Sequence, residues 1–519
     1  MLDRRFPHGV RVAAPLALLL TLLLLLAGCG EGDSSPTSTK GPDPAALAPA
    51  STALYGEAVV RPEGEQKEGA LAAARKVFRV QDPGAELRRL LDKGSEPGET
   101  VFSRDIEPWL GDRVGGFLLM SSGLAEDPDG AAVVAIGDRK ALDEVLARLR
   151  RTNDLGESDR YRGVRYSHDP SDPGTYCTVL GDFYVTGTLA GLRAAIDVFR
   201  GDDSLADASR YTDGVNAVPD DALAFAYLDV RALLPALSSR EDVPPLSRRA
   251  LASVAKSPIV ASLTANADEI AIEASGESEL LDTESSDAEV SVGQLPGDAW
   301  LALATPPIGP LVRSALDSAG VHEQAAAQVR SNLGLDLDRD LLDPLGGLGL
   351  FARGESPLDL GGGVLLQLTD AAAAQRLLTR LQAIVSAGAH LPVRPTSAGD
   401  ARGFQVGVPQ SPQPIVVLAK GDKLAAGYAA PSAEDLLDPQ QRFDESSAGK
   451  AAIDTLGDGY EPSLVVIVPP LAALLRALDQ IEVADFSPVL PYVNAYRSLA
   501  IGTKRDGDRT TVRIVAALR

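Results

Sequence analysis

The chain carries one plan twice in the same order, and this repeat limits its fold more than any other feature of the sequence. The segment 105–111, Asp-Ile-Glu-Pro-Trp-Leu-Gly, matches Asp-Leu-Leu-Asp-Pro-Leu-Gly at 340–346. In both copies two apolar runs follow, and the second run leads to an aspartate, Asp138 or Asp370. Self-similarity in a kept order is typical of duplicated units. We therefore expect a tandem duplication.

After the aspartate, each copy shows a helical pattern and then strand-like hairpins. Asp138 and Asp370 stand where an N-cap residue accepts a backbone hydrogen bond, and the apolar residues after them recur at a helical spacing. The segment Arg-Gly-Val-Arg-Tyr at 162–166 is matched with Arg-Gly-Phe-Gln-Val at 402–406. Hairpin turns are expected at three places: Gly181-Asp182, Gly421-Asp422 and Asp506-Gly507.

Helices and hairpins mix in each copy without strict alternation of strand, helix and strand. This pattern predicts an α+β fold with a mainly antiparallel sheet and helices packed on it. The expected first unit is 47–278, and the expected second unit is 294–519. Between them, the acidic and polar segment 279–293 is expected to be a linker.

The first 28 residues have the pattern of a secretory signal peptide. Arg4, Arg5 and Arg11 precede an apolar run at 12–26, which is shorter than the roughly 18 residues that span a bilayer. Leu-Ala-Gly then precedes Cys29 and resembles the lipobox of bacterial lipoproteins, which implies a lipid on the Cys29 sulfur and cleavage before it. The alternatives are an uncleaved anchor and an ordinary signal peptide.

A polar segment at 29–46, rich in Gly, Ser, Pro and Asp, is expected to be a flexible tether. Acyl chains on Cys29 would hold the protein on a membrane, because each buried methylene contributes roughly 0.8 kcal/mol. We therefore expect a lipid-anchored protein of the cell membrane that faces the extracytoplasmic side.

The charge of the chain excludes one large class of partners. With 72 acidic and 49 basic residues, the formal net charge is −23. Nucleic acid needs a basic surface, so no nucleic-acid partner is expected. The expected partner is the membrane, through the lipid on Cys29, with an envelope protein or an apolar ligand as a further candidate.

Few residues are suited to bind a metal or a cofactor, and we predict neither a metal site nor a cofactor site. The four histidines, His8, His168, His322 and His390, are isolated from other ligand types. The acids at 336–340 alternate as in a calcium loop, but the turn glycine and the closing Glu are missing. Acids that begin a helix explain them better.

Two further residues could be functional or structural. Cys177 is the only cysteine besides Cys29, and its strand-like surroundings favour a buried structural thiol over a reactive one. For Trp109, packing in the core is favoured over stacking on a ligand, because Leu345 takes its place in the second copy.

Sequences that resemble catalytic motifs are incomplete, and no catalytic residue is predicted. The glycines at 345–349 lack the Lys-Ser/Thr of a phosphate-binding loop and are expected to pass from helix to strand. Ser-x-x-Lys occurs at 253–256 and 447–450 without its partner motifs. His168 with Asp169 lies in a loop-like segment.

The segments 49–62, 105–111 and 218–231 resemble a bacterial family catalogued as domain of unknown function 3352. The resemblance covers nearly the whole mature chain. It implies an envelope lipoprotein or a membrane-anchored protein, and it brings no catalytic residues.

Three functions remain open at this point. The leading hypothesis is a non-enzymatic, lipid-anchored binding or scaffolding protein of the envelope. The alternative is a carrier of an apolar ligand or lipid. The third is a hydrolase whose site the spacing of residues does not reveal.

Overall fold

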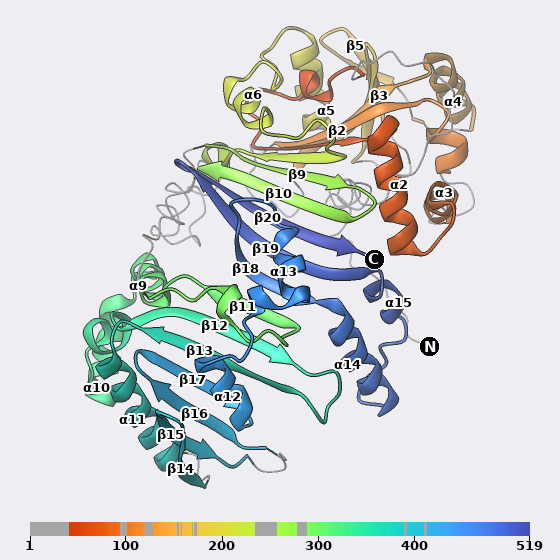
Figure 1. Cartoon of the computed structure of the whole chain (residues 1–519). Helices are drawn as coiled ribbons and strands as arrows, with labels where there is room; N and C mark the ends of the chain where they lie inside the picture. Colours follow the sequence, from red (N-terminus) through yellow and green to blue (C-terminus); the bar gives the residue numbers. More distant parts are fainter. Residues whose placement is uncertain are drawn as a thin grey trace. The chain divides into compact units, whose positions relative to one another are not determined.

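A computed structural model describes residues 41–93, 101–119, 128–152, 155–156, 158–168, 170, 174–233, 257–277, 288–388, 392–408 and 413–519. The chain divides into two compact units, with the boundary after residue 279. Each unit combines helices with antiparallel strands (Figure 1). The predicted α+β class is confirmed. Residues 1–40, which include Cys29, lie outside the described residues.

The first unit contains one antiparallel sheet in its described residues. Its strands are β1 Leu54–Val59, β2 Leu110–Leu119, β3 Asp129–Ile136, β4 Ser158–Tyr161, β5 Val164–His168, β6 Tyr176–Leu180, β7 Phe183–Gly187, β8 Ala224–Leu228, β9 Ile259–Ala265 and β10 Glu269–Glu277. Their order across the sheet is β4-β5-β6-β7-β3-β2-β1-β8-β9-β10. The helical segments are η2 Pro44–Leu47, α2 Gly64–Phe78, α3 Pro83–Lys93, the π-helix η3 Phe102–Ile106, α4 Arg139–Thr152, α5 Leu189–Phe199 and α6 Ser209–Val215.

The second unit is built in the same way. Its strands are β11 Leu301–Thr305, β12 Leu345–Arg353, β13 Gly361–Leu368, β14 Val393–Ala398, β15 Ala401–Val406, β16 Ile415–Lys420, β17 Lys423–Tyr428, β18 Glu461–Ile467, β19 Tyr496–Asp506 and β20 Arg509–Leu518. Its helical segments are η4 Val292–Gln294, α9 Ile308–Ala319, α10 His322–Leu333, the π-helix η5 Leu337–Leu342, α11 Ala371–Gly388, α12 Ala430–Leu437, η6 Phe443–Glu445, α13 Ser447–Asp454, α14 Val468–Gln480 and α15 Leu490–Val493.

The strands of the second unit follow the order β14-β15-β16-β17-β13-β12-β11-β18-β19-β20, again with antiparallel neighbours. Each strand therefore has a counterpart at the same place in the first sheet. This shared order is what the sequence repeat predicts. Its origin in a duplication stays a prediction.

The described ends of both units reach further than the sequence suggests. Ala45, placed in the tether, is fully buried in the core of the first unit. Val290 and Val292, placed in the linker, are buried as well. A few short apolar residues in polar surroundings give no periodic signal. The sequence therefore does not indicate that Ala45, Val290 and Val292 belong to the folded units.

Local signals in the sequence predicted several turns and caps correctly. The turns at Gly181-Asp182 and Gly421-Asp422 are confirmed, and both glycines adopt a positive φ. The third turn lies one residue later than predicted, at Gly507-Asp508.

The two predicted helix caps are also present. The Asp138 side chain accepts from the backbone N–H of Ala141 at 3.0 Å. That of Asp370 accepts from Ala373 at 2.7 Å. These caps place α4 and α11 at the same point of the two units.

One part of the predicted repeat is shifted by three residues. Tyr161 pairs with Val164 across the β4–β5 turn, and Ala398 pairs with Ala401 across the β14–β15 turn. Val164 therefore corresponds to Ala401, whereas the sequence match placed it at Phe404. The shared Arg-Gly dipeptide misled the match, because it forms the turn in the first unit and lies within a strand in the second.

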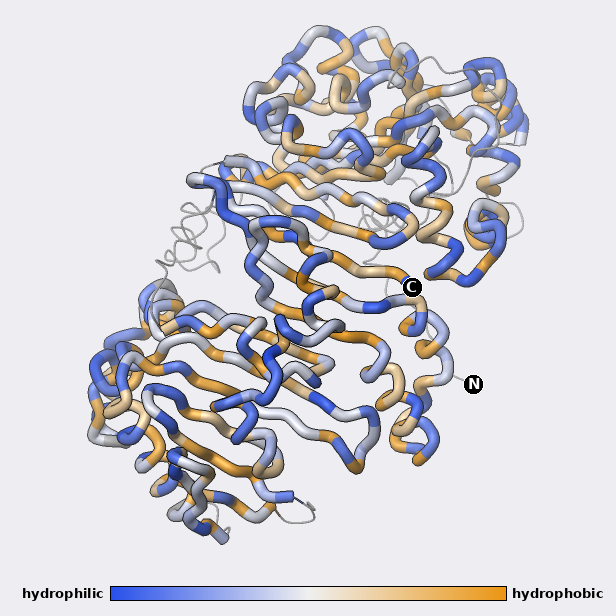
Figure 2. Tube along the Cα trace, in the orientation of Figure 1, coloured by the Kyte–Doolittle hydropathy of each residue, from blue (hydrophilic) through white to orange (hydrophobic). Residues whose placement is uncertain are grey.

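Hydrophobic and hydrophilic residues alternate along many of the strands (Figure 2). In the first unit, α5 packs on one face of the sheet over Val133 and Val185. Helix α4 packs over the alternate residues Val134 and Tyr184. Since successive side chains of a strand point to opposite faces, α4 and α5 cover opposite faces of this sheet.

A charged cluster is buried in the first unit. Glu57 is 3% exposed. Its carboxylate accepts from the Tyr55 hydroxyl at 2.7 Å and from the Arg113 guanidinium at 2.6 Å. Burial raises the pKa of Glu57, and the Arg113 charge and the Tyr55 hydrogen bond oppose that rise. The cluster is a buried polar network whose members satisfy one another.

Both π-helices hold an aspartate in the same hydrogen bond. Asp105 accepts from the backbone N–H of Val101 at 2.8 Å, and Asp340 accepts from that of Asp336 at 2.9 Å. This bond closes the first turn of each π-helix. It explains why the sequence match between 105–111 and 340–346 begins at an aspartate.

Candidate binding groove of the first unit

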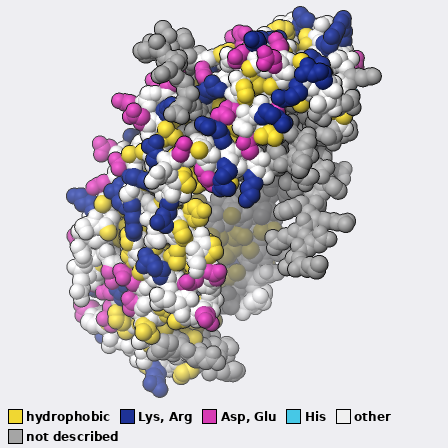
Figure 3. All heavy atoms as spheres, turned by 90° about the vertical axis from the view of Figure 1, so that its right-hand side faces the viewer, with side chains coloured by type: hydrophobic (Ala, Val, Ile, Leu, Met, Phe, Trp, Pro, Cys, Tyr) yellow, Lys and Arg dark blue, Asp and Glu magenta, His cyan; other side chains and the backbone are white. Residues whose placement is uncertain are grey.

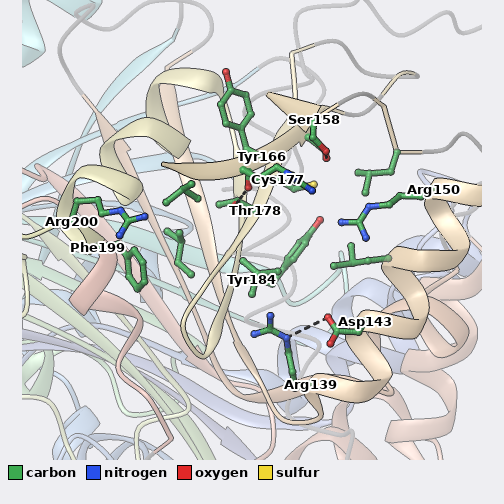
Figure 4. Close-up of a pocket in the computed structure, with 17 residues that line it drawn as sticks. Arg139, Asp143, Arg150, Ser158, Tyr166, Cys177, Thr178, Tyr184, Phe199 and Arg200 are labelled. Atoms are coloured by element: carbon green, nitrogen blue, oxygen red, sulfur yellow. Dashed lines mark hydrogen bonds and ion pairs between the residues drawn. The ribbon is translucent and has the colours of Figure 1, made fainter. Parts of the chain in front are cut away.

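A pocket of about 420 Å³ lies in the first unit, between α4 and the strands β4 to β7 (Figure 4). It is a groove rather than a closed cavity, since buried and exposed residues share its lining. The volume falls within the range of about 300–1,000 Å³ that is usual for small-molecule sites.

Helix α4 forms one wall of the groove. Its apolar stripe, Leu142, Val145 and Leu146, is buried together with Trp109. The Trp109 indole donates to the backbone carbonyl of Asp105 at 2.6 Å, and its ring lies 5.2 Å from that of Tyr184. Packing, the role predicted for Trp109, is confirmed.

A small polar row forms part of the floor. Ser167 pairs with Cys177 between β5 and β6, and both residues are buried. The hydroxyls of Ser158 and Ser167 lie 3.1 Å apart. Cys177 is buried, as predicted. The sequence did not indicate that it lines a groove.

Apolar and aromatic side chains complete the floor. Leu146 and Leu155 line it from the side of α4, and Val179 and Tyr184 line it from β6 and β7. In Figure 4, Tyr184 and Arg150 point toward one another from the sheet and from α4. The floor therefore offers a ligand both apolar contact and a phenol ring.

The same position in the second unit is filled. Phe404 pairs with Val417 as Ser167 pairs with Cys177, at the same distance from the equivalent turns. Phe404 is 1% exposed and packs in one cluster with Val417, Leu424 and Leu378. Leu378 belongs to α11, which is the counterpart of α4. A large ring thus fills, beneath α11, the place that a serine leaves open beneath α4.

Arginines stand along the rim of the groove. Arg139 donates to Asp143 at 3.4 Å and to the backbone carbonyl of Gly181 at 3.2 Å. The Arg200 guanidinium lies over the Phe199 ring, 5.7 Å from its centre. Both side chains already have a neighbour that orients them.

Arg150 and Arg165 differ from Arg139 and Arg200 because the residues described around them give their side chains no such neighbour. Both line the groove and are exposed, and within the described residues neither guanidinium group has a hydrogen bond or an ion pair. Elsewhere in the unit, by contrast, Arg162 pairs with Asp197 and Arg210 with Asp229. Two positive charges thus line the groove without a carboxylate partner in the part of the chain that is described, since the Asp143 carboxylate pairs with Arg139.

Basic residues are frequent around this site although the chain as a whole is acidic. Helix α4 carries five basic and two acidic residues. Figure 3 shows Lys and Arg side chains at many points of the face that it draws. The local potential is therefore more favourable to anions than the net charge implies.

Two of the residues considered as metal ligands, Asp336 and His322, have structural partners. Asp336 caps η5 by accepting from Arg339 at 3.1 Å, which confirms the helix-start interpretation. His322 lies between Asp317 and Asp338, at 2.7 and 3.1 Å. The described residues contain no group of three His, Cys, Asp or Glu side chains that could hold a metal. His390 and the serine and lysine at 253 and 256 lie outside the described residues.

The described helices include none that is both long enough and apolar enough to cross a membrane. The glycines at 345–349 lie in β12, directly after η5, as the predicted passage from helix to strand requires. A Cβ on Gly347 would come within 2.7 Å of the backbone nitrogen of Val290, so this strand needs glycine there.

Comparisons with known proteins give a family but no activity. No curated protein matches the chain. Two solved structures of TP0453 are similar: crystal form I with 11% identity and a TM-score of 0.27, over 47% of this chain and 81% of that one, and crystal form III with 10% identity and a TM-score of 0.19, over 76% and 98%. TM-scores this low support no further conclusion. A family model described as protein of unknown function (DUF3352) matches residues 13–517, and the chain therefore belongs to that family.

Proposed function

We propose that this chain is a lipid-anchored binding protein on the extracytoplasmic side of the membrane, and that the groove of its first unit binds a small ligand. The observation that carries the proposal is the contrast between the two units. The same fold position is packed with a phenylalanine in one unit and left open by a serine in the other. Folding alone would favour the filled arrangement, because protein interiors are close-packed.

The lining supports binding rather than catalysis. Arg150 and Arg165 face the groove without a carboxylate partner among the described residues, and the floor offers apolar and aromatic surface. The described lining contains Cys177, Ser158 and Ser167 but no histidine, and its one carboxylate, Asp143, pairs with Arg139 rather than with one of these side chains. The lipid on Cys29 would keep the groove within reach of the membrane.

The test uses the full mature chain with Cys29→Ser, purified without detergent. Native mass spectrometry should find an added small mass in this chain. Ser167→Phe, which places the second unit's ring in the groove, should remove that mass while leaving the thermal unfolding transition cooperative. An added mass that is equally abundant in both chains would place the ligand elsewhere.

Cys177 gives a second readout, because it is the only thiol left in that chain and it lines the groove. Its reaction with a thiol reagent should slow after the protein is incubated with an organic extract of cell envelopes. A chain that carries no added mass, and whose Cys177 reacts at the same rate before and after incubation, would contradict the proposal.

A further inference from the structure

The groove combines two kinds of surface that one class of ligand would match. Its rim carries guanidinium groups, of which those of Arg150 and Arg165 have no partner among the described residues. Its floor carries Leu146, Val179 and the ring of Tyr184. A small inorganic anion would leave this apolar floor uncovered, and a neutral apolar molecule would leave the charges unanswered.

On the basis of the proposed function, we infer that the ligand is an anionic amphiphile, with an oxyanion head at Arg150 and Arg165 and an apolar body on the floor of the groove. Phosphate and carboxylate oxygens accept paired hydrogen bonds from the fork of a guanidinium. Arg139 and Arg200 are already oriented by Asp143 and Phe199. They therefore contribute to the positive electrostatic potential of the groove rather than free hydrogen-bond donors.

The second unit shows how specific this combination is. By the strand register and the helix caps, Arg150 of α4 corresponds to Gln382 of α11, and Tyr184 corresponds to Leu424. Ser167, as described above, corresponds to Phe404. The Arg150 charge, the phenol and the open space are therefore replaced together in the second unit, whereas Arg165 corresponds to Arg402 and its charge is kept.

Four probes distinguish the contribution of the charged head of the ligand from that of its apolar body. Each is used below its aggregation concentration with the full Cys29→Ser chain. They are dodecyl phosphate, dodecanoate, dodecyltrimethylammonium and inorganic phosphate. Binding is followed by calorimetry and by protection of Cys177 from a thiol reagent, which reports occupancy of the groove itself. We expect at least one of the two anionic amphiphiles to protect Cys177 and to bind at least tenfold more tightly than dodecyltrimethylammonium.

A matched pair of variants tests the two arginines. The double variant Arg150→Gln/Arg165→Gln should weaken binding of the anionic amphiphile at least tenfold. Arg151→Gln is the control, because Arg151 lies on the same helix, is exposed and does not line the groove. Its affinity should stay within twofold of the parent chain. A preference for dodecyl phosphate would point to phosphate-headed lipids as the natural source, and a preference for dodecanoate to fatty acids; either supports the inference.

Three results would overturn it. Equal binding of dodecyltrimethylammonium would show an apolar site without charge selection. Inorganic phosphate binding as tightly as dodecyl phosphate would show an anion site without an apolar part. Failure of all probes to protect Cys177 would also refute it. In each case the proposed function is judged separately, by whether the chain retains a native molecule that Ser167→Phe removes.

Discussion

Ser167 and Phe404 occupy the same position in two units of one fold, yet one lines an open groove and the other fills a core. Each pairs with a residue of the next strand, Cys177 or Val417, and each lies three residues beyond the first residue after its hairpin turn. The difference between the units at this position is therefore one of side-chain volume on a common backbone plan.

The first prediction concerns Phe404. Replacing this buried ring by serine, Phe404→Ser, should lower the free energy of unfolding of the second unit by about 3–5 kcal/mol, because it opens a cavity in a packed cluster. Urea unfolding followed by circular dichroism measures the loss. Ile415→Ser, on the neighbouring strand at a 40% exposed residue, is the control and should cost much less. Equal losses would mean that Phe404 does not support the core.

The second prediction concerns Glu57. Since burial raises the pKa of Glu57 above its ordinary value of 4.5, the folded chain keeps a proton that the unfolded chain has already released. The contribution of this group to stability is therefore greatest below pH 4.5 and declines as the pH rises through the raised pKa. Glu57→Gln should remove that slope from the unfolding free energy measured between pH 4 and pH 8.

Removal of the carboxylate tests the same cluster differently. Glu57→Ala leaves Arg113 buried without its partner and should cost about 3–5 kcal/mol. If Glu57→Ala and Glu57→Gln lost the same small amount, the Tyr55 and Arg113 contacts would contribute little to the fold.

The third prediction compares the two π-helices. The hydrogen bonds from Arg104 and from the backbone N–H of Val101, together with the Arg148 charge, hold the pKa of Asp105 below its ordinary value of 3.8. This stabilisation is complete above pH 3.8 and is lost as the pH falls through the lowered pKa. Asp105→Asn should therefore cost about 2 kcal/mol at pH 7 and less at pH 3.

The counterpart in the second unit is the matched control for this change. Asp340 accepts the equivalent backbone hydrogen bond, but it is only partly buried. Asp340→Asn should cost about 1 kcal/mol at pH 7. A larger loss from Asp340→Asn than from Asp105→Asn would contradict the assigned role of the arginines.

The fourth prediction concerns the anchor. If Cys29 carries the lipid, cells fed an alkyne fatty acid should yield a labelled protein in the membrane fraction, and Cys29→Ser should abolish the label. Cys177→Ser should keep it, since the other cysteine is buried in a strand. Label on the Cys29→Ser chain would refute lipidation at this residue.

The fifth prediction concerns the division of the chain. Segments 41–279 and 280–519, produced separately, should each unfold in a cooperative transition, because each contains its own sheet and its own core. Protease-labile behaviour of both segments would show that the units depend on one another.

Much of the fold could be predicted from the sequence, because its signals are local. Asp138 and Asp370 stand one residue before regular helices, and Gly181-Asp182 and Gly421-Asp422 are turn dipeptides between strand-like runs. Such caps and turns depend on a few neighbouring residues. The order of the sheet follows from the repeat only in part, since register is fixed by contacts between distant strands.

The groove could not be predicted in the same way. Its lining comes from α4 and from strands up to about sixty residues away, from Arg139 to Arg200. Ser167 is unremarkable in sequence, and nothing near Cys177 indicated a groove. The shifted match of 162–166 with 402–406 hid the exchange of serine for phenylalanine. Only the strand register aligns Ser167 with Phe404 and so exposes the exchange.

The ion pair of Arg148 with Asp105 connects α4, which forms one wall of the groove, to the π-helix η3. Arg150 follows two residues later and projects from a helix that this contact already holds in place. A ligand would then meet a preorganised wall and lose little affinity to ordering it. Differences in affinity among ligands should accordingly follow the chemistry of their head and body, and association should be limited by diffusion and orientation rather than by a slow rearrangement of the protein.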